Sequence, residues 1–266
     1  MRNKIITFLI LTFITISGIA QIGGLSGSKL DAFCVDVVDN HKIEFEPTVY
    51  HFESHYEWDE NGNLVDKFHS SDSIKEMTGM AFRFTYGLWN KLELGMSIST
   101  DFELSYWGAR YVLFEKQKIG LALMAGAKVP FGNKTIDKSL RYSNNLTSVG
   151  GGVVVSSQLN EDFSIDFNAQ YMTYVGATAE GNKGSYYLNA DAGYYFFSHQ
   201  LQLIAGFGYQ ISQFDGFDNQ ILTFYPGITV ETGKSYIIVL SVPFDIYGVN
   251  AEKVAGVTLA LTLTFD

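Results

Sequence analysis

The sequence predicts an all-β fold, a transmembrane antiparallel β-barrel of about twelve strands. Apolar and polar residues alternate along most of the chain, and aromatic residues make up 15% of its 266 residues. A period of two places one set of side chains on each face of a strand. The alternating segments are also long. A tilted strand needs about 9–11 residues to cross a bilayer, whereas strands of soluble sheets have about 5–6.

The N-terminus has the pattern of a secretory signal peptide over residues 1–20. Its parts, in chain order, are the positive residues Arg2 and Lys4, the apolar run Ile5–Ile16, and the small residues Gly18 and Ala20. Such a segment is removed on export. We therefore expect an exported chain, whose alternatives are an outer-membrane barrel and a soluble β domain.

Residues 21–40 differ in composition from both neighbours, being rich in Gly and Ser and then acidic. We interpret them as a periplasmic lead-in, and the apolar run Ala32–Val35 could let this segment tuck into a barrel. The barrel itself is predicted over residues 41–266. The chain thus divides into signal peptide, lead-in and barrel.

Twelve segments alternate clearly enough to be predicted as strands. In chain order they are residues 41–58, 79–86, 92–99, 102–115, 119–131, 148–159, 163–171, 188–196, 201–211, 221–231, 238–246 and 254–266. In the last of them Leu259, Leu261 and Leu263 should face lipid, while Thr258 and Thr262 face the lumen. This last strand should close the barrel against residues 41–58, because a sheet in hydrocarbon cannot leave unpaired edges.

The connections between the predicted strands alternate between short turns and longer loops. The longer set includes residues 59–76, 132–147, 214–219 and 248–253. Short turns on one side and longer loops on the other are typical of outer-membrane barrels. Both ends of the barrel domain would then lie on the periplasmic side. The roles of loops 59–76 and 132–147 are left open.

Two short patches resemble a known family. Residues 84–95 read FTYGLWNKLELG, and residues 126–132 read GAKVPFG. They resemble the "MetA-pathway of phenol degradation" family of Gram-negative outer-membrane barrels, which share a Tyr-Gly-Leu-x-Asp/Asn-x-Leu-Glu-Leu-Gly hairpin and a Lys-x-Pro-x-Gly strand end. The patches cover well under a fifth of the chain. The resemblance implies an outer-membrane channel or transporter and leaves the substrate undefined.

Nine ionisable residues fall on the strand faces opposite the apolar ones, where they would line the lumen. They are Glu44, Glu46, Arg83, Glu93, Arg110, Lys128, Asp166, Asp191 and Asp245. Charges there avoid hydrocarbon, where a basic residue at the midplane costs about 2–4 kcal/mol. Two interpretations stay open: a salt-bridged, largely plugged interior, or a charged constriction that selects solutes.

The sequence favours a passive channel or transporter for a small solute in the outer membrane of a Gram-negative bacterium. The alternatives are a structural or envelope-assembly barrel with a plugged lumen, and a soluble exported β-sandwich binding protein. Expected partners are outer-membrane lipid and the barrel-insertion machinery, which would read Phe265 although Asp266 follows it. A net charge of −10 disfavours nucleic acid.

No catalytic, cofactor or metal site is predicted. His51, Glu53 and His55 share one face of an extended strand, but their spread makes shared metal ligation awkward. No Ser stands in a recognisable nucleophile setting beside a His base. The single Cys34 is neither a disulfide partner nor a metal framework. We therefore expect no enzyme.

Overall fold

The computed structural model describes residues 22–27, 29–66, 75–100, 102, 104–131, 146–176, 181–231 and 236–266. The predicted signal peptide, residues 1–20, lies outside the described residues, as do most of loop 132–147 and part of loop 59–76. Within the described ranges, no helix has the length and apolar character needed to span a membrane.

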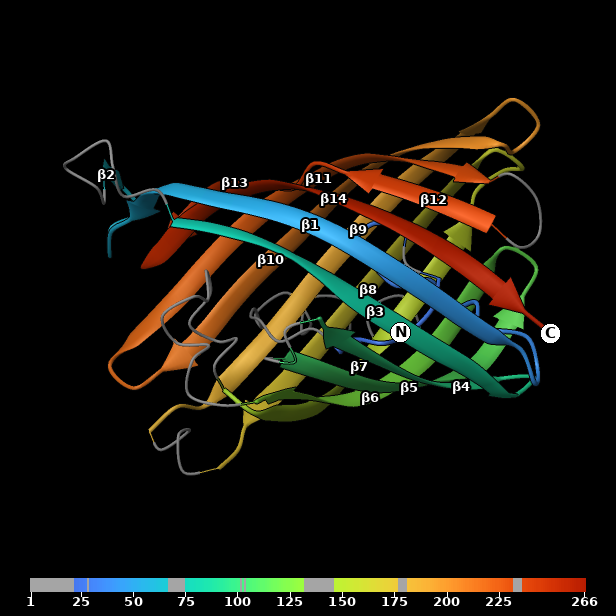
Figure 1. Cartoon of the computed structure of the whole chain (residues 1–266), viewed down its shortest axis with the longest axis horizontal. Coiled ribbons are helices and arrows are strands. Elements are labelled where there is room, and N and C mark those ends of the chain that lie inside the picture. Colours follow the sequence, from blue (N-terminus) through green and yellow to red (C-terminus); the bar gives the residue numbers. More distant parts are fainter. Residues whose placement is uncertain are drawn as a thin grey trace, which may run out of the picture.

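One antiparallel sheet closes on itself into a barrel of twelve strands, which confirms the predicted fold class (Figure 1). Its elements are β1 Ile43–Trp58, β2 Leu64–Asp66, β3 Lys75–Trp89, β4 Leu92–Ser99, β5 Leu104–Lys116, β6 Ile119–Pro130, β7 Ser148–Gln158, β8 Phe163–Tyr174, β9 Gly184–Phe196, β10 Leu201–Phe214, β11 Phe217–Glu231, β12 Tyr236–Ser241, β13 Phe244–Val249 and β14 Ala251–Phe265. The short β2 pairs only with the end of β1. β12 and β13 are the two halves of one strand, which was predicted as continuous and is interrupted at Val242 and Pro243.

Closure is made by β14, which pairs with β1 from Ile43–Phe265 to Trp58–Ala251. The prediction that the last strand closes against the first is therefore confirmed. Every barrel strand has two neighbours. The described sheet therefore has no free edge, whose backbone N–H and C=O groups would stay unpaired in hydrocarbon. The soluble β-sandwich alternative is wrong, because one closed sheet replaces two packed ones.

The two faces of β14 follow the predicted alternation. Leu259 is 45% exposed on the outer surface, whereas Thr262 is 6% exposed and faces inward. Large apolar side chains cover the outside of the other strands in the same way, including Trp107 and Phe207. Tyr174 is an aromatic residue that does not face outward, since it is buried in the interior against Phe214.

The strands are longer than predicted at the end opposite Asp266. Residues 214–219 were expected to form a loop, but Phe214 pairs with Phe217 across a two-residue turn of Asp215 and Gly216. Asp215 followed by Gly216 suits such a turn, because Gly216 takes a positive φ of 84°, which glycine adopts without strain. Residues 248–253 likewise belong to β13 and β14 except for Asn250, whose φ is 49°.

The described connections at the Asp266 end of the barrel are all short, at residues 90–91, 117–118, 159–162 and 197–200, whereas the long connections, such as residues 131–147, lie at the other end. Short turns mark the periplasmic side of outer-membrane barrels, so we name this the periplasmic end and the other the extracellular end. In Figure 1 the C-terminus lies at the periplasmic end and β2 at the extracellular end.

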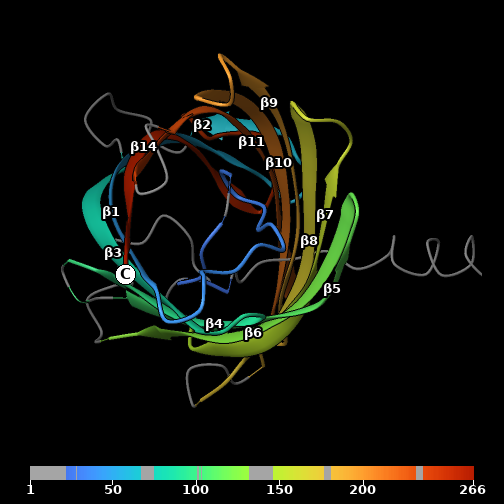
Figure 2. The same ribbon diagram turned by 90° about the vertical axis from the view of Figure 1, so that its right-hand side faces the viewer.

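The residues before β1 do not lie outside the barrel. Figure 2 shows the described part of residues 22–40, in blue, inside the ring of strands. We call these residues the inner segment. It adds no strand to the sheet, and it determines the architecture of the lumen.

Candidate functional site

All nine ionisable residues predicted to face the lumen project into the barrel interior. Six of them are almost wholly buried: Glu93, Arg110, Lys128, Asp166, Asp191 and Asp245. The other three, Glu44, Glu46 and Arg83, have side chains between 12% and 19% exposed. Strand pairing places Glu46 opposite Arg83 and Glu93 opposite Arg110, so opposite charges are direct neighbours.

Arg110 and Glu93 bind the inner segment at two places, Ser26 and residues 34–38. Arg110 donates from Nη1 to the carbonyl of Cys34 at 2.6 Å and from Nη2 to the carbonyl of Ser26 at 3.0 Å and to that of Asp36. Its Nη2 also lies 2.9 Å from Glu93 Oε1. Glu93 accepts hydrogen bonds from the backbone N–H of Ser26 at 3.0 Å and of Val38 at 2.9 Å. The buried ion pair therefore has partners on the segment for both members.

Asp191 binds the middle of the inner segment. Its Oδ2 accepts hydrogen bonds from three successive backbone N–H groups, those of Leu30, Asp31 and Ala32, each at 3.0 Å. Consecutive N–H groups that converge on one oxygen form an anion-binding concavity. Bonds to a charged acceptor are roughly twice as strong as neutral ones. A carboxylate of the wall thus occupies a nest that the segment provides.

The inward face of β8 makes a ladder of polar contacts with the inner segment. Asp166 pairs with Lys29, Asn168 Oδ1 accepts from Phe33 N–H at 2.9 Å, and Gln170 Oε1 accepts from Ile22 N–H at 2.7 Å. Ser156 of β7 accepts from Val35 N–H at 2.9 Å in the same manner. Asn168, Gln170 and Ser156 were not predicted as site residues. The signal that could have found them is the run of polar residues on the inward face of β8.

Inward-facing glycines let the segment lie directly against the wall. Gly95, Gly108 and Gly126 are paired neighbours across β4, β5 and β6. A Cβ on Gly95 would lie 1.7 Å from the carbonyl oxygen of Gly24, and one on Gly108 would lie 2.5 Å from that of Gly23. Any larger residue at these positions would therefore collide with the segment.

Apolar side chains of the segment complete the contact. Ile22, Leu25, Phe33 and Val35 form one buried cluster with wall residues. The wall members of that cluster are Val112, Ala122, Met124, Val154 and Met172. Apolar residues that face a water-filled lumen would be costly, and the segment removes them from water. The wall is therefore adapted to the segment in both polarity and shape.

Arg83 organises the wall at the periplasmic end. Its Nε and Nη2 donate to the two oxygens of Glu46 at 3.2 and 2.6 Å, and its Nη1 donates to Glu44 at 3.2 Å and to the carbonyl of Leu25 at 3.0 Å. One guanidinium thus faces two carboxylates. A chamber of about 370 Å³ adjoins these residues.

Two of the nine predicted residues, Asp245 and Lys128, lie in the wall, outside the contacts described above. Asp245 accepts hydrogen bonds from Thr223 Oγ1 at 2.5 Å and from Val254 N–H at 2.7 Å, both in the wall. Lys128 is buried on β6, beside Tyr106 of β5 in the strand register. The structure therefore brings seven of the nine to the inner segment or to its chamber and leaves these two in the wall.

The extracellular half of the lumen contains two buried clusters of mostly apolar side chains. Trp58, Ile221 and Ala251 form one buried cluster, and Leu146, Tyr174 and Phe214 form another. Tyr187 packs against the first of these and also against the cluster of the inner segment. It connects the two halves of the lumen.

The histidines considered for catalysis or metal binding lie on the outer surface. His51 and His55 each lie within 3.2 Å of the Glu53 carboxylate, and all three side chains are between 39% and 46% exposed. Among the described residues no group of three or more His, Cys, Asp or Glu is arranged to hold a metal ion. The thiol of Cys34 lies in the inner segment, where burial first, and then the neighbouring Asp36, raise its pKa well above the ordinary range.

The sequence matches the model of a known protein family. The profile of the family described as "Membrane bound beta barrel domain (DUF5777)" matches residues 50–241, well over half of the chain. The chain belongs to this family. Membership makes the barrel a membrane-bound one, whose outer surface contacts lipid, and closed antiparallel barrels of this type are found in the outer membrane of Gram-negative bacteria. Among curated proteins no match is found.

Solved structures share the fold of this membrane-bound barrel at low sequence identity. The COG4313 outer membrane channel from Pseudomonas putida F1 has a TM-score of 0.66 and 15% identity, with 87% of this chain and 98% of that chain covered. The KdgM porin in complex with disordered oligogalacturonate has a TM-score of 0.54 and 8% identity, with 85% and 99% covered. The Pseudomonas channel is of the MetA-pathway of phenol degradation family, so the resemblance seen in the sequence is confirmed at the level of the fold.

Proposed function

We propose that the chain is a passive channel for a small polar solute across the outer membrane, closed in the present conformation by its own inner segment. The observation that supports this most directly is how the segment is held. It is bound by side chains of the wall, such as Arg110 and Asp191, and it is not a strand of the sheet. It can therefore leave the lumen without breaking the strand pairing that closes the barrel.

The polar wall supports the same proposal. When the segment leaves, Glu93, Arg110, Asp166 and Asp191 would face water, which can hydrate them. In a purely structural barrel, buried charges bring little stability relative to apolar packing, because their desolvation offsets most of the attraction. A lumen lined by charged groups suits the passage of hydrated solutes. Two solved barrels of the same fold are a channel and a porin by name.

The test compares the full chain with a variant that lacks residues 22–38, each refolded into planar bilayers. We expect rare or small conductance steps from the full chain and larger, frequent ones from the variant. Correct folding is checked by the shift in gel mobility on heating. If both folded proteins give no steps at any voltage, the channel proposal fails. The alternative, a structural or envelope-assembly barrel with a plugged lumen, would then stand.

Two further roles belong to this proposal. We infer that the barrel-insertion machinery recognises Phe265, which is 50% exposed and precedes the terminal Asp266. Asp266 lies 3.3 Å from Lys42 Nζ at the start of β1. Phe265→Ala should lower the amount of protein in the outer membrane, and an unchanged amount would overturn this role. We also infer that the chain is no enzyme, which is supported by the two solved barrels of the same fold, a channel and a porin by name.

A further inference from the structure

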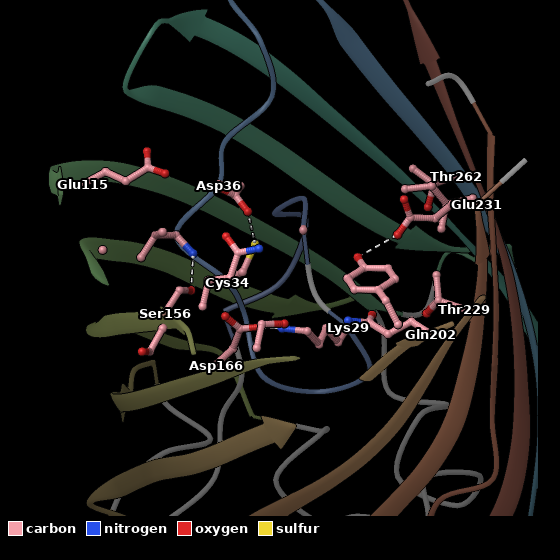
Figure 3. A pocket seen from close by; sticks show the side chains of 18 of the residues that line it. Lys29, Cys34, Asp36, Glu115, Ser156, Asp166, Gln202, Thr229, Glu231 and Thr262 are labelled. Atoms are coloured by element: carbon pink, nitrogen blue, oxygen red, sulfur yellow. Dashed lines mark hydrogen bonds and ion pairs between the residues drawn. The ribbon is translucent and has the colours of Figure 1, made fainter. Parts of the chain in front are cut away.

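The chamber at the periplasmic end of the lumen is the strongest candidate for a binding site. It lies between the inner segment and the wall, with a volume of about 370 Å³. Figure 3 shows Lys29 and Asp36 of the segment on its border, facing Glu231 and Gln202 of the wall. This volume is at the lower end of the range for small-molecule sites, about 300–1,000 Å³.

The chamber has an excess of negative charge. Six carboxylates line it, namely Asp36, Glu44, Glu46, Glu115, Asp166 and Glu231, against three cations, Lys29, Arg83 and Lys118. Arg83 pairs with both Glu44 and Glu46, and Lys29 pairs with Asp166. Glu231 is oriented by a hydrogen bond from Tyr195 at 2.8 Å and has no basic partner among the described residues that line the chamber. The field in the chamber therefore favours cations.

The inner segment already demonstrates how the wall binds an ammonium group. Lys29 reaches across the chamber to Asp166 of β8, whose side chain is only 2% exposed (Figure 3). It is the single basic residue of residues 22–40. A tethered ammonium on a buried carboxylate shows that the chamber accommodates such a group with a partner.

Two buried polar side chains of the wall indicate a second property of a ligand for the chamber, the ability to form hydrogen bonds. Gln202 is 2% exposed and Thr229 is 5% exposed, and both line the chamber. Neither Nε2 of Gln202 nor Oγ1 of Thr229 has a hydrogen-bond partner among the described residues. An unpaired buried polar group costs about 1–3 kcal/mol, so a hydrogen-bonding partner that enters the chamber would stabilise this part of the wall.

We propose that the chamber binds a small organic cation that also has hydroxyl groups, such as an amino alcohol or an amino sugar. The ammonium group is held by Glu231, and hydroxyl oxygens accept from Gln202 and contact Thr229. Neutral analogues lose the charge-assisted bond, and anions are repelled by the excess of carboxylates. This proposal rests on the channel function, because the chamber is the periplasmic part of the path.

The test uses the full folded chain in detergent and two matched pairs of probes. Ethanolamine is compared with ethylene glycol, and glucosamine with glucose, by isothermal titration calorimetry at equal ionic strength. We expect each cation to bind about tenfold more tightly than its neutral partner, as for the loss of one charge-assisted hydrogen bond. Equal affinities within both pairs, or no measurable binding of any probe, would overturn the proposal.

Variants locate the binding within the chamber. Glu231→Gln keeps the hydrogen bond from Tyr195 and removes the charge, and we expect it to weaken the binding of the cations about tenfold. The control is Glu161→Gln, which removes an exposed carboxylate at the same end of the barrel but outside the chamber. Gln202→Met is a second variant, which should weaken the hydroxylated cations while the charge stays. If Glu231→Gln and Gln202→Met both bind the cations like the unchanged chain, the site is not this chamber.

Binding in detergent does not depend on conductance, so the two proposals can fail separately. A folded barrel that binds glucosamine without conducting overturns only the channel. A barrel that conducts, without discriminating glucosamine from glucose, overturns only the cation site.

Discussion

The two halves of the lumen contain different kinds of contact. In the periplasmic half, charged and amide side chains of the wall bind the backbone of the inner segment, as Arg110 and Asp191 do. In the extracellular half, Trp58, Ile221 and Ala251 pack directly against one another. The backbone of an irregular segment needs partners for its N–H and C=O groups, whereas apolar side chains need only contact.

This difference indicates which part of the lumen can open. Releasing the segment hydrates the polar groups of the wall, but it also exposes the apolar cluster of Ile22, Leu25, Phe33 and Val35. The segment is not a strand of the sheet, so it can leave without breaking strand pairing, whereas Trp58, Ile221 and Ala251 belong to the paired strands of the wall. We therefore expect the periplasmic half to be the exchangeable one and the extracellular half to be structural.

The largest expected effect comes from Arg110→Met. The variant loses the donors to three carbonyls of the segment and leaves Glu93 buried without its cation. Removing one partner of a buried pair costs about 3–5 kcal/mol, and release of the segment would relieve it by hydrating Glu93. The measurement is maleimide labelling of Cys34, the single Cys of the chain, which should become fast.

A double variant sharpens this first prediction. Glu93→Gln combined with Arg110→Met removes both charges, so the combined effect should be smaller than the sum of the two single effects. Additive effects on the rate of Cys34 labelling would show that the Glu93–Arg110 ion pair does not hold the segment in the lumen.

Trp58→Ala should affect the extracellular half of the lumen and leave the periplasmic half unchanged. Truncating a buried Trp costs about 3–5 kcal/mol. We expect a lower urea midpoint for unfolding of the barrel and unchanged labelling of Cys34, because Trp58 packs in the extracellular cluster. Fast labelling in this variant would break the distinction between the halves.

Gly108→Val tests the close approach of segment and wall. Its added side chain would collide with Gly23 and Leu25, at an overpacking cost of about 1–3 kcal/mol. Labelling of Cys34 should rise about tenfold to a hundredfold. Ala109→Val is the matched control, since it adds similar volume to the next residue on the outer, lipid-facing groove. Similar rates of Cys34 labelling in the two variants would show that the segment does not depend on close approach to Gly108.

The smallest expected effect is on pH dependence. Burial raises the pKa of the Cys34 thiol while the segment is seated, so the seated state favours the protonated thiol. The stability that the thiol contributes is therefore complete at neutral pH and is lost as pH rises through the raised pKa. Iodoacetamide rates should rise at more alkaline pH in the unchanged chain than in Arg110→Met. Coincident pH profiles would show that seating of the segment does not raise the pKa of the Cys34 thiol.

Several features could be predicted from the residues alone because they are local. The alternation of Leu259 with its neighbours gave the face of β14, and the same rule oriented Glu93, Arg110 and Asp191 inward. The Asp215–Gly216 turn was also within reach, since Asp-Gly favours a two-residue hairpin. A loop was predicted there because the length of the strands beyond the membrane is not encoded in the alternation.

The sequence by itself therefore determined a barrel, its closure and the face of each strand, because a period of two is a property of each strand alone. Only the tertiary structure decided what meets the inward face. The contact between Ile22 and Gln170 joins residues 148 positions apart, and the row of Gly95, Gly108 and Gly126 exists only through the register of three strands. Composition indicated that residues 21–40 could tuck inside, but their seat depends on a closed barrel that places Asp191, Asp166 and Arg110 around one segment.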